Sequence, residues 1–343
     1  RNSHCGAGNK PARMVVGALI VKHVENLSDE KTIQAIQENP YMQYLLGLSK
    51  FTEKPVFVPE LFVLIRKRLN QDFFNMLTLM LAEADGSKPK KEGTDEDGND
   101  HGGTMKCDAT CCDAEVRFKM YEQQKMMFDQ KVRSCADHII SVYQPHLRPI
   151  VRGKAKAKVE FGAKIGACIV NGYTYVDHLC WDAYNESSDF AMQIELYRKR
   201  FGMLPREVQV DKIYLGKANR QYLKDNNVEC CNRPLGRPPK EDNDRHAEEK
   251  RRAICERNEI EATFGTSKRV YRANNIRAKL DNTADTWIGA CFFAKNAMKF
   301  LRGLLCLVYA KTGLEAPKKR VLSAIDDLVG VLPSPQVSWG RIN

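Results

Sequence analysis

The chain has 343 residues, which is enough for two domains or for one large domain with an appendage. Its content of 43% hydrophobic and 8% aromatic residues excludes a generally disordered protein. The net charge of +11, from 54 basic and 43 acidic residues, favours a polyanionic partner, and nucleic acid more than a membrane. The longest apolar runs, residues 14–21 and 75–82, fall short of the ~20 residues that span a bilayer, so we expect no membrane anchor.

The twelve cysteines do not form a disulfide framework, because many of them fall in apolar, strand-like segments where free thiols behave as small hydrophobes. A zinc site of Cys107, Cys111, Cys112 and His101 is disfavoured, since adjacent residues of a strand point to opposite faces. A reducing compartment follows, and we expect a cytoplasmic, nucleoid-associated protein.

Residues 1–84 are predicted to form a helical N-terminal domain. Ser28, followed by two acidic residues, is typical of a helix start, and Asn39-Pro40 ends that helix and precedes another. A later helix carries the basic cluster 66–68, which suits a DNA-binding module. An ordinary helical bundle with solvated basic residues fits the same pattern equally well.

Residues 85–103 are rich in Asp, Glu, Lys and Gly and lack apolar spacing, so we interpret them as a solvated linker. Residues 105–112 predict a first strand. Residues 158–170 and 172–180 predict a hairpin, because Asn171-Gly172 is a strong turn signal.

An alternation of helices and strands is expected next. Helices are predicted at 187–201 and 217–225, and strands at 207–210 and 228–231. A Pro/Gly-rich loop at 233–240 precedes a long helix predicted over 245–268. These elements complete a second domain, residues 104–312, and residues 313–343 form a C-terminal tail.

The long helix carries a distinctive set of charges. Arg257, Glu261 and Lys268 are spaced i, i+4 and i+11, so a helix places them within about 40° of one another. A carboxylate between two cations suits a metal ion held beside gripped phosphates. Asp108 and Asp211, both in strand-like contexts, extend the acidic set to three.

Each acidic residue has a rival. Asp113 lies in the same strand region as Asp108, but its odd-numbered offset points it to the other face. Glu259 competes with Glu261, and Asp225 competes with Asp211. A carboxylate at a strand end is ordinary surface charge in most proteins, and Arg257 and Lys268 could equally form ordinary ion pairs.

Two basic segments are candidates for DNA contact. The first runs from 148 to 164 and has a single acidic residue, Glu160, among six basic ones: Arg148, Arg152, Lys154, Lys156, Lys158 and Lys164. Such a run can track phosphates without reading sequence, or it can be only a solvated face. The second is Arg233-Pro-Leu-Gly-Arg237-Pro-Pro-Lys240, in which Arg237 could enter a minor groove; a stiff linker is the alternative.

The ordered series of motifs resembles the DDE transposases of bacterial insertion sequences, over residues 12–304. The resemblance rests on Asn26-Leu-Ser-Asp-Glu, Glu38-Asn-Pro-Tyr-Met-Gln-Tyr44, Cys107-Asp-Ala-Thr110, the basic run, and Ala273-Asn-Asn-Ile-Arg-Ala-Lys279 after the glutamate helix. It implies an α/β fold, with a mixed five-stranded ribonuclease H-like sheet flanked by helices after a small all-α domain.

The resemblance also implies an activity: cleavage of double-stranded DNA at terminal inverted repeats and transfer of the 3′ ends to target DNA, by a homodimer. Asp108, Asp211 and Glu261 would be the catalytic metal ligands. Hard oxygen ligands favour Mg²⁺, and Mn²⁺ should substitute.

Three features depart from the family pattern. A stretch of domain-insert size that often follows the segment 113–118 is expected to be missing, Ile254 stands where the family usually has tyrosine, and the chain begins at Arg1 as a fragment would. The rival hypotheses are therefore a deleted, inactive derivative that only binds DNA, and a nuclease without strand transfer.

Overall fold

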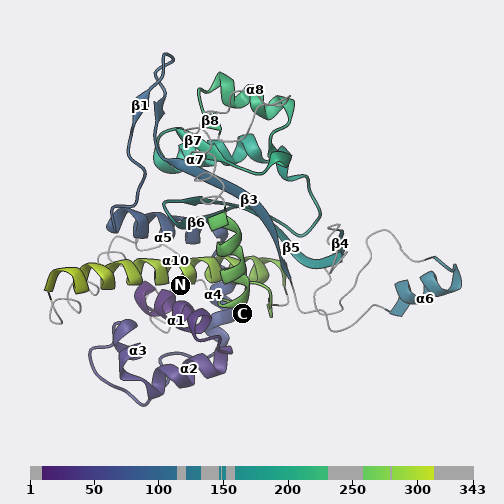
Figure 1. Cartoon of the computed structure of the whole chain (residues 1–343). Coiled ribbons are helices and arrows are strands. Elements are labelled where there is room, and N and C mark those ends of the chain that lie inside the picture. The colour runs from purple at the N-terminus through teal and green to yellow at the C-terminus, as the bar shows by residue number, and fades with distance from the viewer. Residues whose placement is uncertain are drawn as a thin grey trace, which may run out of the picture.

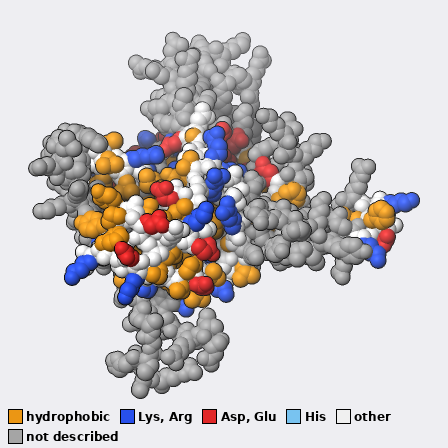
Figure 2. All heavy atoms as spheres, turned by 90° about the horizontal axis from the view of Figure 1, so that it is seen from below, with side chains coloured by type: hydrophobic (Ala, Val, Ile, Leu, Met, Phe, Trp, Pro, Cys, Tyr) orange, Lys and Arg blue, Asp and Glu red, His pale blue; other side chains and the backbone are white. Residues whose placement is uncertain are grey.

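In the computed structural model, the described residues are 10–113, 121–132, 147, 149–151, 159–230, 258–278 and 280–312. Five helices come first: α1 (Ala12–Val24), α2 (Asp29–Glu38), α3 (Pro40–Leu45), α4 (Glu60–Arg66) and α5 (Gln71–Ala84). Ser28 caps α2 by accepting from the Lys31 amide, and Asn39 caps α3. Both signals predicted for this segment are therefore confirmed. Seen from below, this end of the molecule shows several basic side chains in a row beside apolar ones (Figure 2).

The segment expected to be a solvated linker contains a short hairpin of β1 (Gly93–Thr94) and β2 (Asp100–His101). Asp95 accepts from the backbone amide of Asn99 and contacts the His101 ring at 2.9 Å. The hairpin was missed because its ordering depends on one buried histidine and its turn, not on an alternating apolar pattern.

A mixed sheet forms the centre of the molecule (Figure 1). Its strands are β3 (Thr104–Asp113), β4 (Pro149–Val151), β5 (Val159–Val170), β6 (Tyr173–Cys180), β7 (Glu207–Gln209) and β8 (Glu229–Cys230). β5 lies antiparallel to β3 and β6, whereas β7 lies parallel to β3 and β8. The order β6-β5-β3-β7-β8 is that of a ribonuclease H-like fold, as predicted, and the short β4 adds a sixth strand on β5.

The predicted turn between β5 and β6 is confirmed by its backbone. Asn171 has φ of 50° and Gly172 has φ of 79°, so both central residues adopt the left-handed conformation that a tight hairpin turn requires. A methyl group on Gly172 would also approach a Lys299 side-chain carbon to 2.6 Å. The turn therefore favours glycine for both its conformation and its space.

Helices cover both faces of the sheet. The first cover is formed by α7 (Phe190–Phe201) and α8 (Lys217–Asp225). The second consists of the helix at residues 258–269 and the 32-residue α10 (Asp281–Thr312). The remaining helices are α6 (Tyr121–Asp129) and two 3₁₀ turns, η1 (Glu186–Ser188) and η2 (Lys212–Tyr214). Among the described residues, no helix combines the length and the apolar character needed to cross a membrane.

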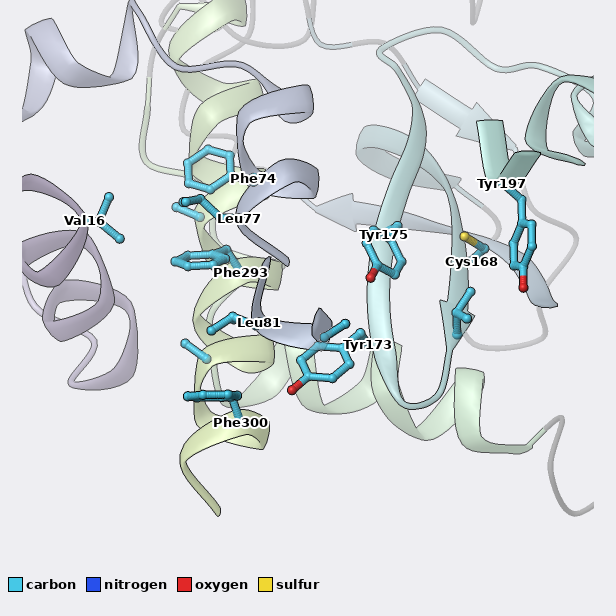
Figure 3. Packing of buried hydrophobic residues seen from close by; sticks show 14 of the residues in the cluster. Val16, Phe74, Leu77, Leu81, Cys168, Tyr173, Tyr175, Tyr197, Phe293 and Phe300 are labelled. Atoms are coloured by element: carbon cyan, nitrogen blue, oxygen red, sulfur yellow. The ribbon is translucent and has the colours of Figure 1, made fainter. Parts of the chain in front are cut away.

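The core extends without a break from the N-terminal helices to the sheet. Phe74 and Leu77 of α5 pack with Phe293 of α10, and the same cluster continues to Tyr175 of β6 and Tyr197 of α7 (Figure 3). A second cluster fills the other face of the sheet, between β5 and the helices at 258–269 and α10. Because α10 contributes to both clusters, it is buried on several sides.

Two asparagines tie the helices to the outer edge of β6. Asn75 of α5 donates to the Val176 carbonyl at 2.7 Å and accepts from the Val176 amide at 3.1 Å. Asn296 of α10 likewise donates to the Thr174 carbonyl at 2.8 Å and accepts from the Thr174 amide at 3.1 Å. Each side-chain amide thus takes the place of a neighbouring strand and satisfies backbone groups that the edge would otherwise leave unpaired.

Candidate functional site

Asp108 lies in the middle of β3, on the face covered by the helix at 258–269. It stands opposite Ala167 of β5, which belongs to the second core cluster. The side chain is half-buried, and its Oδ1 accepts from the Ala109 amide at 2.8 Å. The neighbours Cys107 and Ala109 are buried, as the alternation of a strand requires.

Asp211 lies two residues past the end of β7, and its charge acts on Asp108. β7 pairs with β3 in a parallel register that aligns Met105 with Val208 and Lys106 with Gln209. Extending that register by two residues sets Asp211 beside Asp108. Asp211 is exposed, and its carbonyl accepts from the Tyr214 amide at 3.0 Å, which closes the turn into η2.

Glu261 lies on the helix at 258–269, which is anchored by buried Ile260 and Phe264. Both anchors belong to the cluster that contains Ala167, so the helix packs on the same face of the sheet that carries Asp108. Glu261 itself is exposed. Packing of its neighbours, not burial of its own carboxylate, therefore brings it toward the strand.

Electrostatics connect these carboxylates. The pKa of Asp108 is raised from 3.8 to about 6, chiefly by burial, with contributions from the charges of Glu186, Asp211 and Glu261 and against the Ala109 hydrogen bond, which lowers it. Asp211 and Glu261 are thus each within electrostatic reach of Asp108. Within the described part of the chain, however, no three His, Cys, Asp or Glu side chains stand close enough to enclose a metal ion.

The donor set nevertheless fits a hard divalent cation. All the groups are carboxylates, they come from a strand, a strand end and a helix, and their mutual repulsion is what a cation would relieve. To hold one ion together, exposed Asp211 and Glu261 would have to converge on half-buried Asp108.

Glu186 was not predicted from the sequence. It begins η1, and it forms an ion pair with Lys164 of β5 at 2.9 Å, with both side chains largely buried. Lys164 also donates to the Tyr184 carbonyl at 2.7 Å and lies over the Tyr184 ring. An acidic residue in the first turn of a helix is common, because it interacts favourably with the helix dipole, so the sequence offers no signal for its proximity to Asp108.

The rival carboxylates occupy different surroundings. Glu259 contacts Lys106 of β3, its Oε2 lying 2.7 Å from Nζ. Asp225, at the end of α8, accepts from Gln221 at 2.6 Å. The side chain of Asp113 is not among those described. Glu259 is thus closer to β3 than the helical-face argument implies, but its partner is a lysine.

Of the predicted DNA-binding residues, Lys268 is described. It is half-buried and follows Glu261 by seven residues, which sets it about 20° away around the helix and roughly 10 Å along it. The other predicted contacts lie outside the described residues: Arg257, Arg148, Arg152, Lys154, Lys156, Lys158 and Arg237.

A ribonuclease H-like sheet with one carboxylate on β3, one just after β7 and one on the helix at 258–269 is typical of the DDE class of proteins. Comparison with protein families gives two matches: Transposase DDE domain over residues 208–296, and Transposase domain (DUF772) over residues 1–68. These two matches support a DDE transposase of insertion-sequence type. No curated protein and no solved structure matches it.

Proposed function

We propose that this transposase cleaves DNA at the ends of an insertion sequence and joins the freed 3′ ends to target DNA, in a reaction that depends on a divalent metal. The observation that supports the proposal most is the set of carboxylates around Asp108. Asp211 and Glu261 come from separate elements, and both raise the pKa of the Asp108 carboxyl. Carboxylates in such proximity are costly without a cation to neutralise them.

Asp108, Asp211 and Glu261 would hold the metal, with Asp108 as the central ligand. Mg²⁺ suits three carboxylates, and Mn²⁺ should substitute. The chemistry that a bound ion supplies is stabilisation of charge on the phosphate oxygens and a lower pKa for the attacking water or 3′-hydroxyl. The chain needs no nucleophile of its own.

The protein groups around the carboxylates would orient the DNA. Lys268 projects from the same helix as Glu261, so it can contact a phosphate adjacent to the cleaved one. The basic residues from Arg148 to Lys158 and Arg237 would add contacts along the backbone, and Arg257 would flank Glu261 from the N-terminal side. Lys164, at the end of the same run, is buried and paired with Glu186 and is not included. We expect a homodimer in the cytoplasm, each subunit holding one inverted repeat.

The test is a nicking and joining assay on duplex DNA that carries the element ends, in Mg²⁺ and in Mn²⁺. Asp211→Asn and Glu261→Gln should abolish nicking and leave DNA binding intact. The matched control is Glu259→Gln, the same change two residues away on the same helix. It removes only a half-exposed ion pair with Lys106, worth about 0–1 kcal/mol, so nicking should persist.

Three outcomes would contradict the proposal or part of it. Equal loss from Glu259→Gln and Glu261→Gln would remove the distinction between the two glutamates. DNA binding by the unmutated chain without nicking in either metal would assign it to the inactive derivative. Nicking without joined products would assign it to the nuclease.

A further inference from the structure

A cavity of about 100 Å³ lies where the end of α1, the loop after the Glu261 helix and α10 meet. Exposed Asn26, Arg272 and Arg277 form its rim, and buried Lys22 and Trp287 lie deeper. Its volume equals that of roughly three water molecules at liquid density. A tetrahedral oxyanion has about this size.

The cavity is strongly cationic. No acidic residue lines it, and Asp29, which contacts the lining residue Lys22 at 2.8 Å, is also paired with Arg66 at 2.7 Å, so two cations neutralise one carboxylate. Neither Arg272 nor Arg277 has an ion-pair partner among the residues that the structure describes. The positive charge at the rim is therefore available to a ligand.

Two polar side chains of the cavity wall also have unused hydrogen-bonding atoms. The Nε1 atom of Trp287 is buried and has no partner within the described residues, although its ring packs against His23 and beneath the Lys22 ammonium. The Oδ1 atom of Asn275 is buried and likewise unpaired among these residues. Turning that amide by 180° would present its NH₂ group instead. A buried N–H without a partner destabilises the fold, and a ligand oxygen that accepted from it would relieve that cost.

The loop that builds the rim is held in place by the turn that follows α1. Asn26 donates to the Val270 carbonyl at 3.1 Å, and both Asn26 and Arg272 have positive φ, 56° and 60°. This loop contains the Ala273-Asn-Asn-Ile-Arg stretch, to which the proposed chemistry assigns no role. The conformation of this loop places Arg272 and Arg277 at one cavity, which is lined by segments that lie far apart in the sequence.

We propose that this cavity binds a single phosphate group through Arg272, Arg277 and the Trp287 N–H. This inference rests on the proposed function, which makes the DNA backbone the phosphate source that fits best. Glu261 and residue 269 are separated by about 12 Å of helix, and Arg272 follows three residues later. A duplex advances about 34 Å per turn, so one strand could reach both places within about half a turn.

The first experiment tests the site without DNA. The unfolding temperature is measured in inorganic phosphate and in chloride at matched ionic strength, for the unmutated chain and for the double variant Arg272→Gln/Arg277→Gln. The control is Arg302→Gln, at an exposed arginine of α10 that does not line the cavity. Because phosphate stabilises most proteins weakly by exclusion, the difference between variants is decisive. The phosphate-specific rise should disappear in the double variant and persist in the control.

The second experiment identifies the source, from the salt dependence of duplex DNA binding. Two arginines on one phosphate should lower the slope of log K against log[salt] by about 0.9 together, whereas two phosphates would give about 1.8. Trp287→Phe removes a neutral donor, so it should weaken binding severalfold and leave the slope unchanged.

A reduced slope supports the DNA backbone as the source, and lost phosphate stabilisation with an unchanged slope points to free phosphate. If the double variant matched Arg302→Gln both in its phosphate stabilisation and in its salt slope, the proposal would be overturned. If no nicking were observed, the proposed function would be contradicted, but both measurements could still be interpreted because neither depends on nicking.

Discussion

Replacing Asp108 with asparagine should stabilise the metal-free protein while destroying its metal site. Asparagine keeps the shape of the side chain and its capacity to accept from the Ala109 amide, but removes the charge that burial and three carboxylates oppose. The pKa rises from 3.8 to about 6, roughly two units, and each unit corresponds to 1.36 kcal/mol. The expected gain above pH 7 is on the order of 2–3 kcal/mol, as an upper bound.

The pH dependence follows from the direction of this shift. Between pH 4 and 6 the folded state keeps a proton on Asp108 that the unfolded state has released, so the unmutated protein loses stability as pH rises through this interval. Below pH 4 the carboxyl is protonated in both states and the advantage of Asp108→Asn vanishes. Other groups titrate in the same range, and therefore the difference between the two proteins is the quantity to plot.

The assay is thermal unfolding in a chelator and again in excess Mg²⁺. For a chain of this length, 2–3 kcal/mol corresponds to a melting temperature higher by roughly 3–4 °C. Mg²⁺ should raise the melting temperature of the unmutated protein and leave Asp108→Asn unchanged, because the ligand set is broken. An Asp108→Asn variant that is less stable in chelator at pH 8 would refute the charge-repulsion argument.

Two further predictions concern stability. Asn75→Ala should cost about 1–3 kcal/mol, because it leaves both backbone groups of Val176 without partners, and Asn296→Ala should do the same through Thr174; losses below 0.5 kcal/mol in urea unfolding would mean that water replaces the amides. Burial lowers the pKa of His23 from 6.5 to about 3, so the folded state excludes a proton that the unfolded state binds. Stability should therefore fall as pH drops below 6.5, and His23→Gln should flatten this acid limb; an unchanged limb would contradict the assignment.

Much of the sheet was predictable because its signals are local. Alternating apolar residues mark β3, and Asn171-Gly172 fixes the hairpin by backbone conformation alone. α10 was not anticipated, since a helix buried between two clusters lacks a single apolar stripe.

The residues of the candidate site likewise fall into those that could be predicted from the sequence and those that could not. Asp108, Asp211 and Glu261 could be proposed from neighbouring residues and order along the chain. Glu186 could not, because its proximity to Asp108 arises from the path between β6 and α7. The contact between Glu259 and Lys106 likewise depends on how the helix lies across the sheet, which periodicity does not specify.

Through the contact of Asn75 with β6, the N-terminal helices protect the edge of the sheet from pairing with another protein chain. Asn75 belongs to α5, so a shortened protein that began at β3 would expose the Val176 amide and carbonyl on an open edge. Such an edge invites a strand from another copy, the first step toward aggregation. The N-terminal helices therefore cannot be replaced freely by another domain, because without α5 the edge of the sheet could pair with a strand from another chain.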